Sequence, residues 1–173
     1  MLIVFTGNGK GKTTASLGQA IRAVGRGKNV LMIQFIKGPW KSGEDFIDLK
    51  SADGKGGFEL KKMGLGFVGI LGDQLPKEAH AKAAEEALEY FKKELPKRDL
   101  IILDEVNVAV SLGLLSDKKV LDSVKKLSPE KIVILTGRDA PESFIKAADL
   151  VTEMKEVKHP FNKRQFAKIA VEF

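Results

Sequence analysis

Apolar and polar positions alternate along the chain in two distinct patterns. One is the amphipathic stretch, in which apolar residues recur every three or four positions, the period of a helix. The other is a short, almost wholly apolar run, which is typical of a buried strand. Runs of the second kind occur at 2–7, 29–38, 99–105 and 131–137.

The clearest amphipathic helix is expected over 76–96, with Pro76 at its entrance and Pro96 at its exit. Its predicted buried face consists of Ala83, Ala84, Ala87, Leu88, Phe91 and Leu95. An earlier helix is expected within 13–27, where Leu17, Ala20, Ile21 and Val24 share one face. Further helices are expected over 117–127 and 141–148, a short strand over 57–64 and a last core strand over 149–157.

Alternating strands and helices predict an α/β fold, in which helices cover both faces of a mostly parallel sheet. No internal repeat or long linker divides residues 1–173, so we expect a single domain. In such a sheet, ligands bind beside the carboxyl ends of the strands. The loops after residues 6, 36, 104 and 136 should therefore lie along one edge.

A glycine-rich loop, "TGNGKGKTT" (6–14), follows the first strand and precedes a helix. Its end, Gly11-Lys12-Thr13, is that of a phosphate-binding P-loop, in which the lysine contacts phosphate and the hydroxyl ligates Mg²⁺. Thr6, however, stands where the usual pattern has its first glycine. The alternative interpretation is a glycine-rich turn that contains lysine and threonine by chance.

Two acids, Asp104 and Glu105, end the apolar run at 99–105. In a P-loop domain, an acid at the end of a buried strand suits Mg²⁺ binding. The alternative is that Asp104 only caps the next helix. Together with the glycine loop, the acids predict a P-loop nucleotide-binding domain, but they do not identify its reaction.

The amino-acid composition excludes several classes of protein. The chain contains no cysteine, which excludes a disulfide framework and a cysteine zinc site. No apolar run reaches the roughly 18 residues of a membrane-spanning helix, and a cytoplasmic location is expected. The net charge of +6 could serve nucleic acid or anionic small molecules. Because no run interleaves aromatic and basic residues, nucleic acid is the less favoured partner.

Four stretches together resemble the P-loop type of ATP:corrinoid adenosyltransferase and extend from residue 6 to 161. They read "TGNGKGKTTASLGQAIRAVGRGKNV", "IQFIKGPWKSGE", "LIILDEVNVAVSLGLL" and "ILTGRDAPESFIKAADLVTEMKEVKHPF". The resemblance implies ATP as co-substrate, Mg²⁺, and a corrinoid whose Co(I) attacks the ribose C5′ so that triphosphate leaves. The resemblance also implies that ATP is held in the reverse orientation to that in ordinary P-loop enzymes. The loop with Thr6 and Lys10 would then be this family's own variant of the P-loop.

The resemblance also implies the site residues. Lys12, Asp104 and Glu105 are expected to be catalytic, with Thr13 and Asp104 at the metal. Substrate contacts are expected from Thr6, Gly7, Asn8, Gly9, Lys10, Gly11, Lys12, Thr13, Thr14, Gln34, Lys37, Phe67, Asn107 and Arg138. The family's partners would be a reduced flavoprotein that supplies Co(I) and a second subunit of a homodimer.

In the segment "GLGFVGILGD" (64–73), Phe67 matches one aromatic residue of the family's corrinoid loop, and Gly69 stands in place of a tryptophan. Its glycines predict that 64–74 is mobile without ligand and ordered by corrinoid. His80 is expected to face solvent, and a structural role is expected for both His80 and His159. Two other functions remain open: an ordinary P-loop ATPase or kinase, which would yield ADP, and a non-catalytic ATP- or nucleic-acid-binding module.

Overall fold

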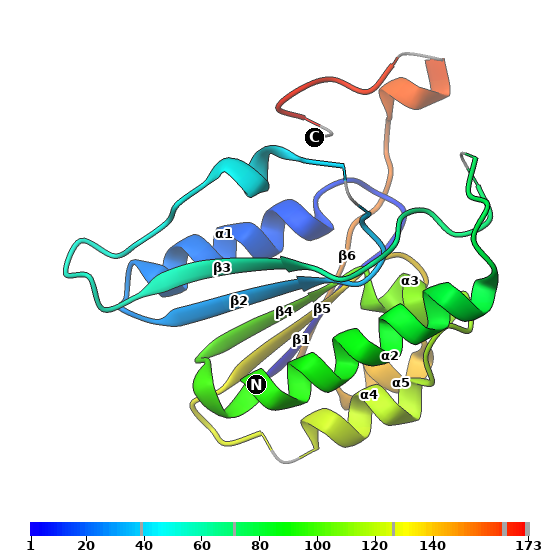
Figure 1. Cartoon of the computed structure of the whole chain (residues 1–173). Coiled ribbons are helices and arrows are strands. Elements are labelled where there is room, and N and C mark those ends of the chain that lie inside the picture. The colour runs from blue at the N-terminus through cyan, green and yellow to red at the C-terminus, as the bar shows by residue number, and fades with distance from the viewer. Residues whose placement is uncertain (39, 71, 126, 164–165, 172–173) are drawn as a thin grey trace.

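A computed structural model gives the fold, and it describes all residues except 39, 71, 126, 164–165 and 172–173. Six parallel strands form one sheet in the order β3-β2-β4-β5-β1-β6 (Figure 1). The strands are β1 (Leu2–Thr6), β2 (Asn29–Gln34), β3 (Gly57–Lys62), β4 (Leu100–Asp104), β5 (Ile132–Thr136) and β6 (Leu150–Glu153).

Helices cover both faces of the sheet, which confirms the predicted α/β architecture. Figure 1 shows α1 (Lys12–Val24) on one face and α2 (Lys77–Glu94), α4 (Asp117–Val124) and α5 (Glu142–Ala147) on the other. The short α3 (Val106–Ser111) packs into the same core as α2, α4 and α5. No helix in the described ranges has the length and apolar character needed to cross a lipid bilayer.

The buried face of α2 was predicted in the main: Ala84, Ala87, Leu88 and Phe91 are all fully buried. Leu95 is only half-buried, and His80 and Glu94 are buried although they were not predicted to be. In α1, Ala20 and Val24 are buried as expected, but Ile21 is wrong, because its side chain is 59% exposed. The helix buries the i, i+4 row Ser16–Ala20–Val24 against the sheet, and Ile21 lies beside that row.

Several predicted boundaries need correction. The chain leaves β2 at Gln34, whose carbonyl accepts the amides of Met63 and Gly64, so the strand is shorter than 29–38. The predicted core strand 149–157 is wrong in both length and burial. Only Leu150–Glu153 is extended, it pairs with β1 at the edge of the sheet, and all four residues are exposed. Periodicity also missed α3, which is too short to show a helical repeat.

The remaining elements are three short 3₁₀ helices at Gly43–Phe46, Leu95–Lys97 and Pro160–Lys163. The second of them continues α2 and contains Pro96, so the predicted exit of the helix is close to the observed one. The first, Gly43–Phe46, lies in the loop between β2 and β3. It brings the side chain of Glu44 back to Gln34 at the end of β2.

Parallel pairing aligns the carboxyl ends of the strands. Gln34 is the register partner of Asp104, and Phe5 is the partner of Thr136. The loops after β1, β2, β4 and β5 therefore open along one edge, as predicted, and the site is built there.

Candidate functional site

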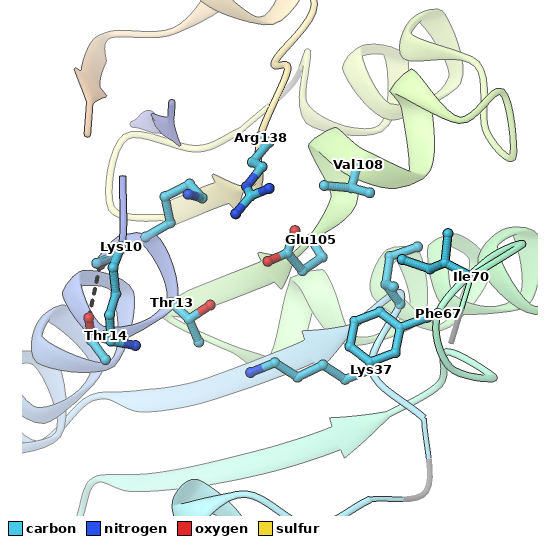
Figure 2. A pocket seen from close by; sticks show the side chains of 12 residues that line it. Lys10, Thr13, Thr14, Lys37, Phe67, Ile70, Glu105, Val108 and Arg138 are labelled. Atoms are coloured by element: carbon cyan, nitrogen blue, oxygen red, sulfur yellow. Dashed lines mark hydrogen bonds between the residues drawn. The ribbon is translucent and has the colours of Figure 1, made fainter. Parts of the chain in front are cut away.

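A pocket of about 430 Å³ lies at the carboxyl edge of the sheet, within the usual size of small-molecule sites. Its lining comes from the loops after four strands and from the segment that follows β3. Figure 2 shows P-loop side chains on one side, Phe67, Ile70 and Val108 opposite, and Glu105, Arg138 and Lys37 between them. The lining residues are Lys10, Gly11, Lys12, Thr13, Thr14, Ile36, Lys37, Phe67, Ile70, Glu105, Val108 and Arg138.

The glycine loop rests on the end of β6, which explains two of its glycines. A Cβ at Gly7 would lie 2.5 Å from the carbonyl oxygen of Met154, and one at Gly9 would lie 2.7 Å from it. Gly7 also has φ 94°, which side chains disfavour. The amide of Gly9 donates to the Met154 carbonyl at 2.7 Å. These glycines therefore hold the loop in place, and in this structure the Gly9 amide is engaged there rather than free for phosphate.

Lys12 begins α1 and is only 8% exposed. Its ammonium donates to the carbonyl oxygens of Gly7 (2.7 Å) and Gly9 (2.8 Å). Burial lowers the pKa of this ammonium, and the charge of Glu105 counters part of that shift. The positive end of α1 points at the same place, so this end of the pocket suits a polyanion.

Thr6, the residue in place of the first P-loop glycine, ends β1 with its side chain buried. Its hydroxyl accepts a hydrogen bond from the amide of Ala140 at 3.2 Å. The threonine thus joins the start of the glycine loop to the loop after β5. The variant position has a structural role here that a glycine could not fill.

Asp104 is fully buried and forms the centre of a hydrogen-bond network. Its Oδ1 accepts the hydroxyls of Thr13 (2.9 Å) and Thr136 (2.8 Å), while Oδ2 accepts the amide Nε2 of Gln34 (3.1 Å). The capping alternative is wrong, because the residue that precedes α3 is Glu105, and no side chain caps that helix. The carboxylate of Asp104 instead faces the first turn of α1.

The Thr13 hydroxyl and the Asp104 carboxylate are oxygen donors of the kind that Mg²⁺ prefers. Within the described part of the chain, no group of three or more histidine, aspartate or glutamate side chains could hold a metal ion by itself. The hydroxyl and carboxylate oxygens of Thr13 and Asp104 fit Mg²⁺ that shares phosphate oxygens with a bound nucleotide, which is how proteins usually hold this ion.

Glu105 adopts a left-handed conformation with φ 62°, and its side chain enters the pocket (Figure 2). Burial, with the nearby charge of Asp104, raises its pKa to about 7. The cations Lys12, Lys37 and Arg138 oppose that rise but do not cancel it. Near neutral pH, this carboxyl can therefore exist in either charge state.

Glu44, in the 3₁₀ helix Gly43–Phe46, was not among the predicted site residues. Its Oε1 accepts hydrogen bonds from Lys37 Nζ (2.9 Å) and Gln34 Nε2 (3.2 Å). Burial alone would raise the pKa of Glu44, but the hydrogen bond and charge of Lys37 lower it to about 2. Lys37 also lies 3.6 Å from Asp104 Oδ2, so one cation bridges two carboxylates. A single acid in a polar loop shows no periodic signal. The one indication in the sequence was that Glu44 lies in "IQFIKGPWKSGE", a stretch that carries the family resemblance.

The predicted rim residues divide into two groups. Lys37 and Arg138 line the pocket, whereas Gln34 and Asn107 are buried below it. The Asn107 amide donates to the carbonyls of Gly137 (3.0 Å) and Phe5 (3.3 Å), so it ties β1 to the turn after β5. The side-chain carbonyl oxygens of Gln34 and Asn107 have no hydrogen-bond partner among the described residues.

The apolar side of the pocket contains three residues that the sequence did not single out: Ile36, Ile70 and Val108. Phe67 is 46% exposed, and its ring stacks on Trp40 with centroids 5.9 Å apart. A second hollow of about 380 Å³ lies beside the first and shares Ile36, Lys37 and Phe67 with it. Single apolar residues in loops resemble any other loop position, which is why they were missed.

The expectation that His80 faces solvent is wrong. The residue is 3% exposed, and its Nε2 lies 3.0 Å from Asp73 Oδ2. His159 lies in the tail, where its carbonyl accepts the amide of Asn162.

A glycine loop at the start of a helix, its lysine, and a threonine bonded to an acid at a strand end define a P-loop nucleotide-binding protein. Comparison with known proteins goes further. Residues 1–173 match the family model described as ATP:corrinoid adenosyltransferase BtuR/CobO/CobP. The whole chain is 36% identical to the corrinoid adenosyltransferase of Escherichia coli K12 and to corrinoid adenosyltransferase CobA of Salmonella typhimurium, covering 85% of each. It is likewise 36% identical to the Pseudomonas aeruginosa enzyme, covering 83% of that protein. The chain therefore belongs to the ATP:corrinoid adenosyltransferases, enzymes that transfer the adenosyl group of ATP to a corrinoid.

Proposed function

We propose that the pocket holds ATP with its triphosphate against the glycine loop and its ribose C5′ toward the apolar side, where the corrinoid lies. The observation that carries this proposal is the polarity of the pocket. Lys10, Thr13 and Thr14 lie on one side, at the start of α1, and Phe67 and Ile70 lie on the other (Figure 2).

The reaction is a displacement at carbon. The electron pair of Co(I) attacks C5′ and becomes the Co–C bond, while the C5′–O bond breaks and its electrons leave with the triphosphate. Because the nucleophile is the cobalt of the substrate, no protein nucleophile or general base is required. The protein contributes orientation and charge stabilisation.

Negative charge grows on the triphosphate as it leaves, and Lys12, Lys10 and the glycine-loop amides other than that of Gly9 would stabilise it. Mg²⁺, held through Thr13 and Asp104, would add a Lewis acid on the phosphate oxygens. Glu105 and Arg138 lie between the two sides of the pocket, which suits contacts with the ribose.

The wall for the corrinoid is proposed to extend beyond the first pocket. Phe67 lies between the two hollows, and Trp40 continues the apolar surface on its far side. A macrocycle much larger than a nucleotide requires such an extended surface. A reduced flavoprotein as electron donor, a homodimer and a cytoplasmic location belong to the proposal only through the family.

The test is incubation of the protein with ATP, Mg²⁺ and chemically reduced cobalamin. The proposal predicts the spectral change of Co–C bond formation with one inorganic triphosphate released per bond. A reaction without reductant controls for hydrolysis. Steady release of ADP without Co–C bond formation would instead establish a P-loop ATPase, and binding of DNA with no turnover would establish a nucleic-acid module.

A further inference from the structure

The loop that carries Phe67 and Ile70 ends at Asp73, a half-buried residue whose side chain is 9% exposed. The Oδ2 of Asp73 accepts the amide of Gly69 at 2.8 Å, and Oδ1 accepts the amide of Leu75 at 3.1 Å. The amide of Asp73 in turn donates to the carbonyl of Ile70 at 3.2 Å. One carboxylate therefore organises the backbone on both sides of itself and fixes the turn that places Ile70 at the pocket.

The other end of this loop is held by close backbone packing. The amide of Gly66 donates to the carbonyl of Ile36 at 3.0 Å. A Cβ at Gly38 would lie 2.8 Å from the Cα of Gly66, so the two segments touch. Between these two attachments, Gly69 and Gly72 have positive φ, and the backbone there is free to move if one attachment is lost.

His80 connects Asp73 to the core of the protein. It lies in the first turns of α2, on the face that also bears Ala84 and Ala87, which are both fully buried. Its Nε2 lies 3.0 Å from the Asp73 carboxylate, so Nε2 must carry the proton in this contact. The side chains of His80 and Asp73 are only 3% and 9% exposed.

We propose that His80 is a positioning residue for the corrinoid. Through Asp73 it holds the segment bearing Phe67 and Ile70 in place, so that the apolar wall of the pocket exists before the corrinoid arrives. The identity of the ligand rests on the proposed function, but the anchoring does not. Amide hydrogen bonds and His80 hold the pKa of Asp73 below its usual range, which keeps the carboxylate available as an acceptor.

Three variants test the role of His80 through the kinetics of adenosylation. His80→Ala removes the donor, and we expect the KM for corrinoid to rise about tenfold while the KM for ATP stays within about twofold. His80→Gln retains an N–H donor of similar reach and should recover most of the loss. Ala79→Gly weakens the same helix turn without touching Asp73, and it should leave both KM values unchanged.

Hydrogen exchange gives a second readout that does not depend on activity. In His80→Ala, the amides of Gly69 and Leu75 should exchange at least about tenfold faster than in the wild type, whereas Ala79→Gly should leave them protected. If the wild-type protein did not adenosylate a corrinoid, the proposed function would be overturned. The exchange experiment would still test whether His80 anchors the loop through Asp73. Unchanged corrinoid KM and unchanged exchange in His80→Ala would overturn the anchor while the proposed function stood.

Discussion

Thr13 and Asp104 are 91 positions apart in the chain, yet the hydroxyl of Thr13 donates a 2.9 Å hydrogen bond to Oδ1 of Asp104. This contact joins the first turn of α1 to the end of β4. It brings the two expected metal-binding groups together directly below the pocket.

Lys12→Ala should reduce turnover at least about a hundredfold, because it removes a cation from the site where charge grows on the leaving triphosphate. The structure adds an effect on stability, since the Lys12 ammonium also bonds the carbonyls of Gly7 and Gly9. We expect a loss of about 1–3 kcal/mol in denaturant titration. Lys93→Ala, at an exposed position of α2, is the matched control, and near-normal turnover of Lys12→Ala would contradict the P-loop assignment.

Asp104→Asn should raise the Mg²⁺ concentration needed for half-maximal activity by about tenfold. The amide group would present a donor either to Thr13 and Thr136 or to Gln34, all of which now donate to this side chain. The corrinoid KM should stay near its wild-type value. A change confined to the corrinoid KM would contradict the assignment of Asp104 to the metal site.

Glu44→Gln tests the acid that the sequence did not reveal. The pKa of Glu44 is lowered on folding to about 2, so its stabilising effect is present above pH 4.5 and is lost as the pH falls toward 2. The variant should lose roughly 1–2 kcal/mol at pH 7, after allowance for solvent screening, and show a flatter stability profile below pH 4.5. Glu86→Gln, at an exposed position of α2, should keep the wild-type profile.

Glu105→Gln should have the opposite effect on stability. The pKa of Glu105 rises on folding to about 7, so its favourable contribution is complete below pH 4.5 and is lost as the pH rises through 7. At pH 8 the ligand-free variant should be more stable than the wild type, by up to about 3 kcal/mol. At pH 4 the two should be alike, and equal stability at both pH values would contradict the raised pKa. Turnover should nevertheless fall in the variant.

Phe67→Ala should slow adenosylation from Co(II) with a reductase far more than from preformed Co(I), because displacement of the lower cobalt ligand matters for reduction and not for attack on C5′. The stacked ring makes the sole tryptophan, Trp40, a reporter of the same loop. Corrinoid should change Trp40 fluorescence in the wild type more than in Phe67→Ala, and ATP alone should change it little. Equal kinetic losses in both assays would show that Phe67 is only a packing surface.

The expected mobility of 64–74 without ligand stays a prediction, and Leu71 within it lies outside the described residues. The contacts of Gly66 and Asp73 attach both ends of that loop. Because the amide of Gly69 is also bonded to Asp73, movement in the wild type should be small at Gly66, Gly69 and Asp73 and greatest around Gly72. Hydrogen exchange with and without corrinoid would measure it.

Features that depend on neighbours along the chain could be predicted from the sequence. Apolar runs of strand length and the α2 periodicity were enough for the parallel α/β sheet. A strand followed by a glycine loop and then a helix was enough to place Lys12 and Thr13 at the carboxyl edge of the sheet. The position of Asp104 could be predicted because the carboxyl ends of all strands in a parallel sheet lie at the same edge.

Tertiary structure decided the features that depend on contacts across the chain. A histidine within a charged helix looks solvated until Asp73 from a loop meets it, and Glu44 looks like a surface acid until Lys37 and Gln34 surround it. Likewise the apolar residues of 149–157 do not show where a strand lies in the sheet, and β6 is exposed because it pairs with β1 at the end of the strand order. Burial is set by what packs against a side chain, and local pattern carries no information about a partner distant in sequence.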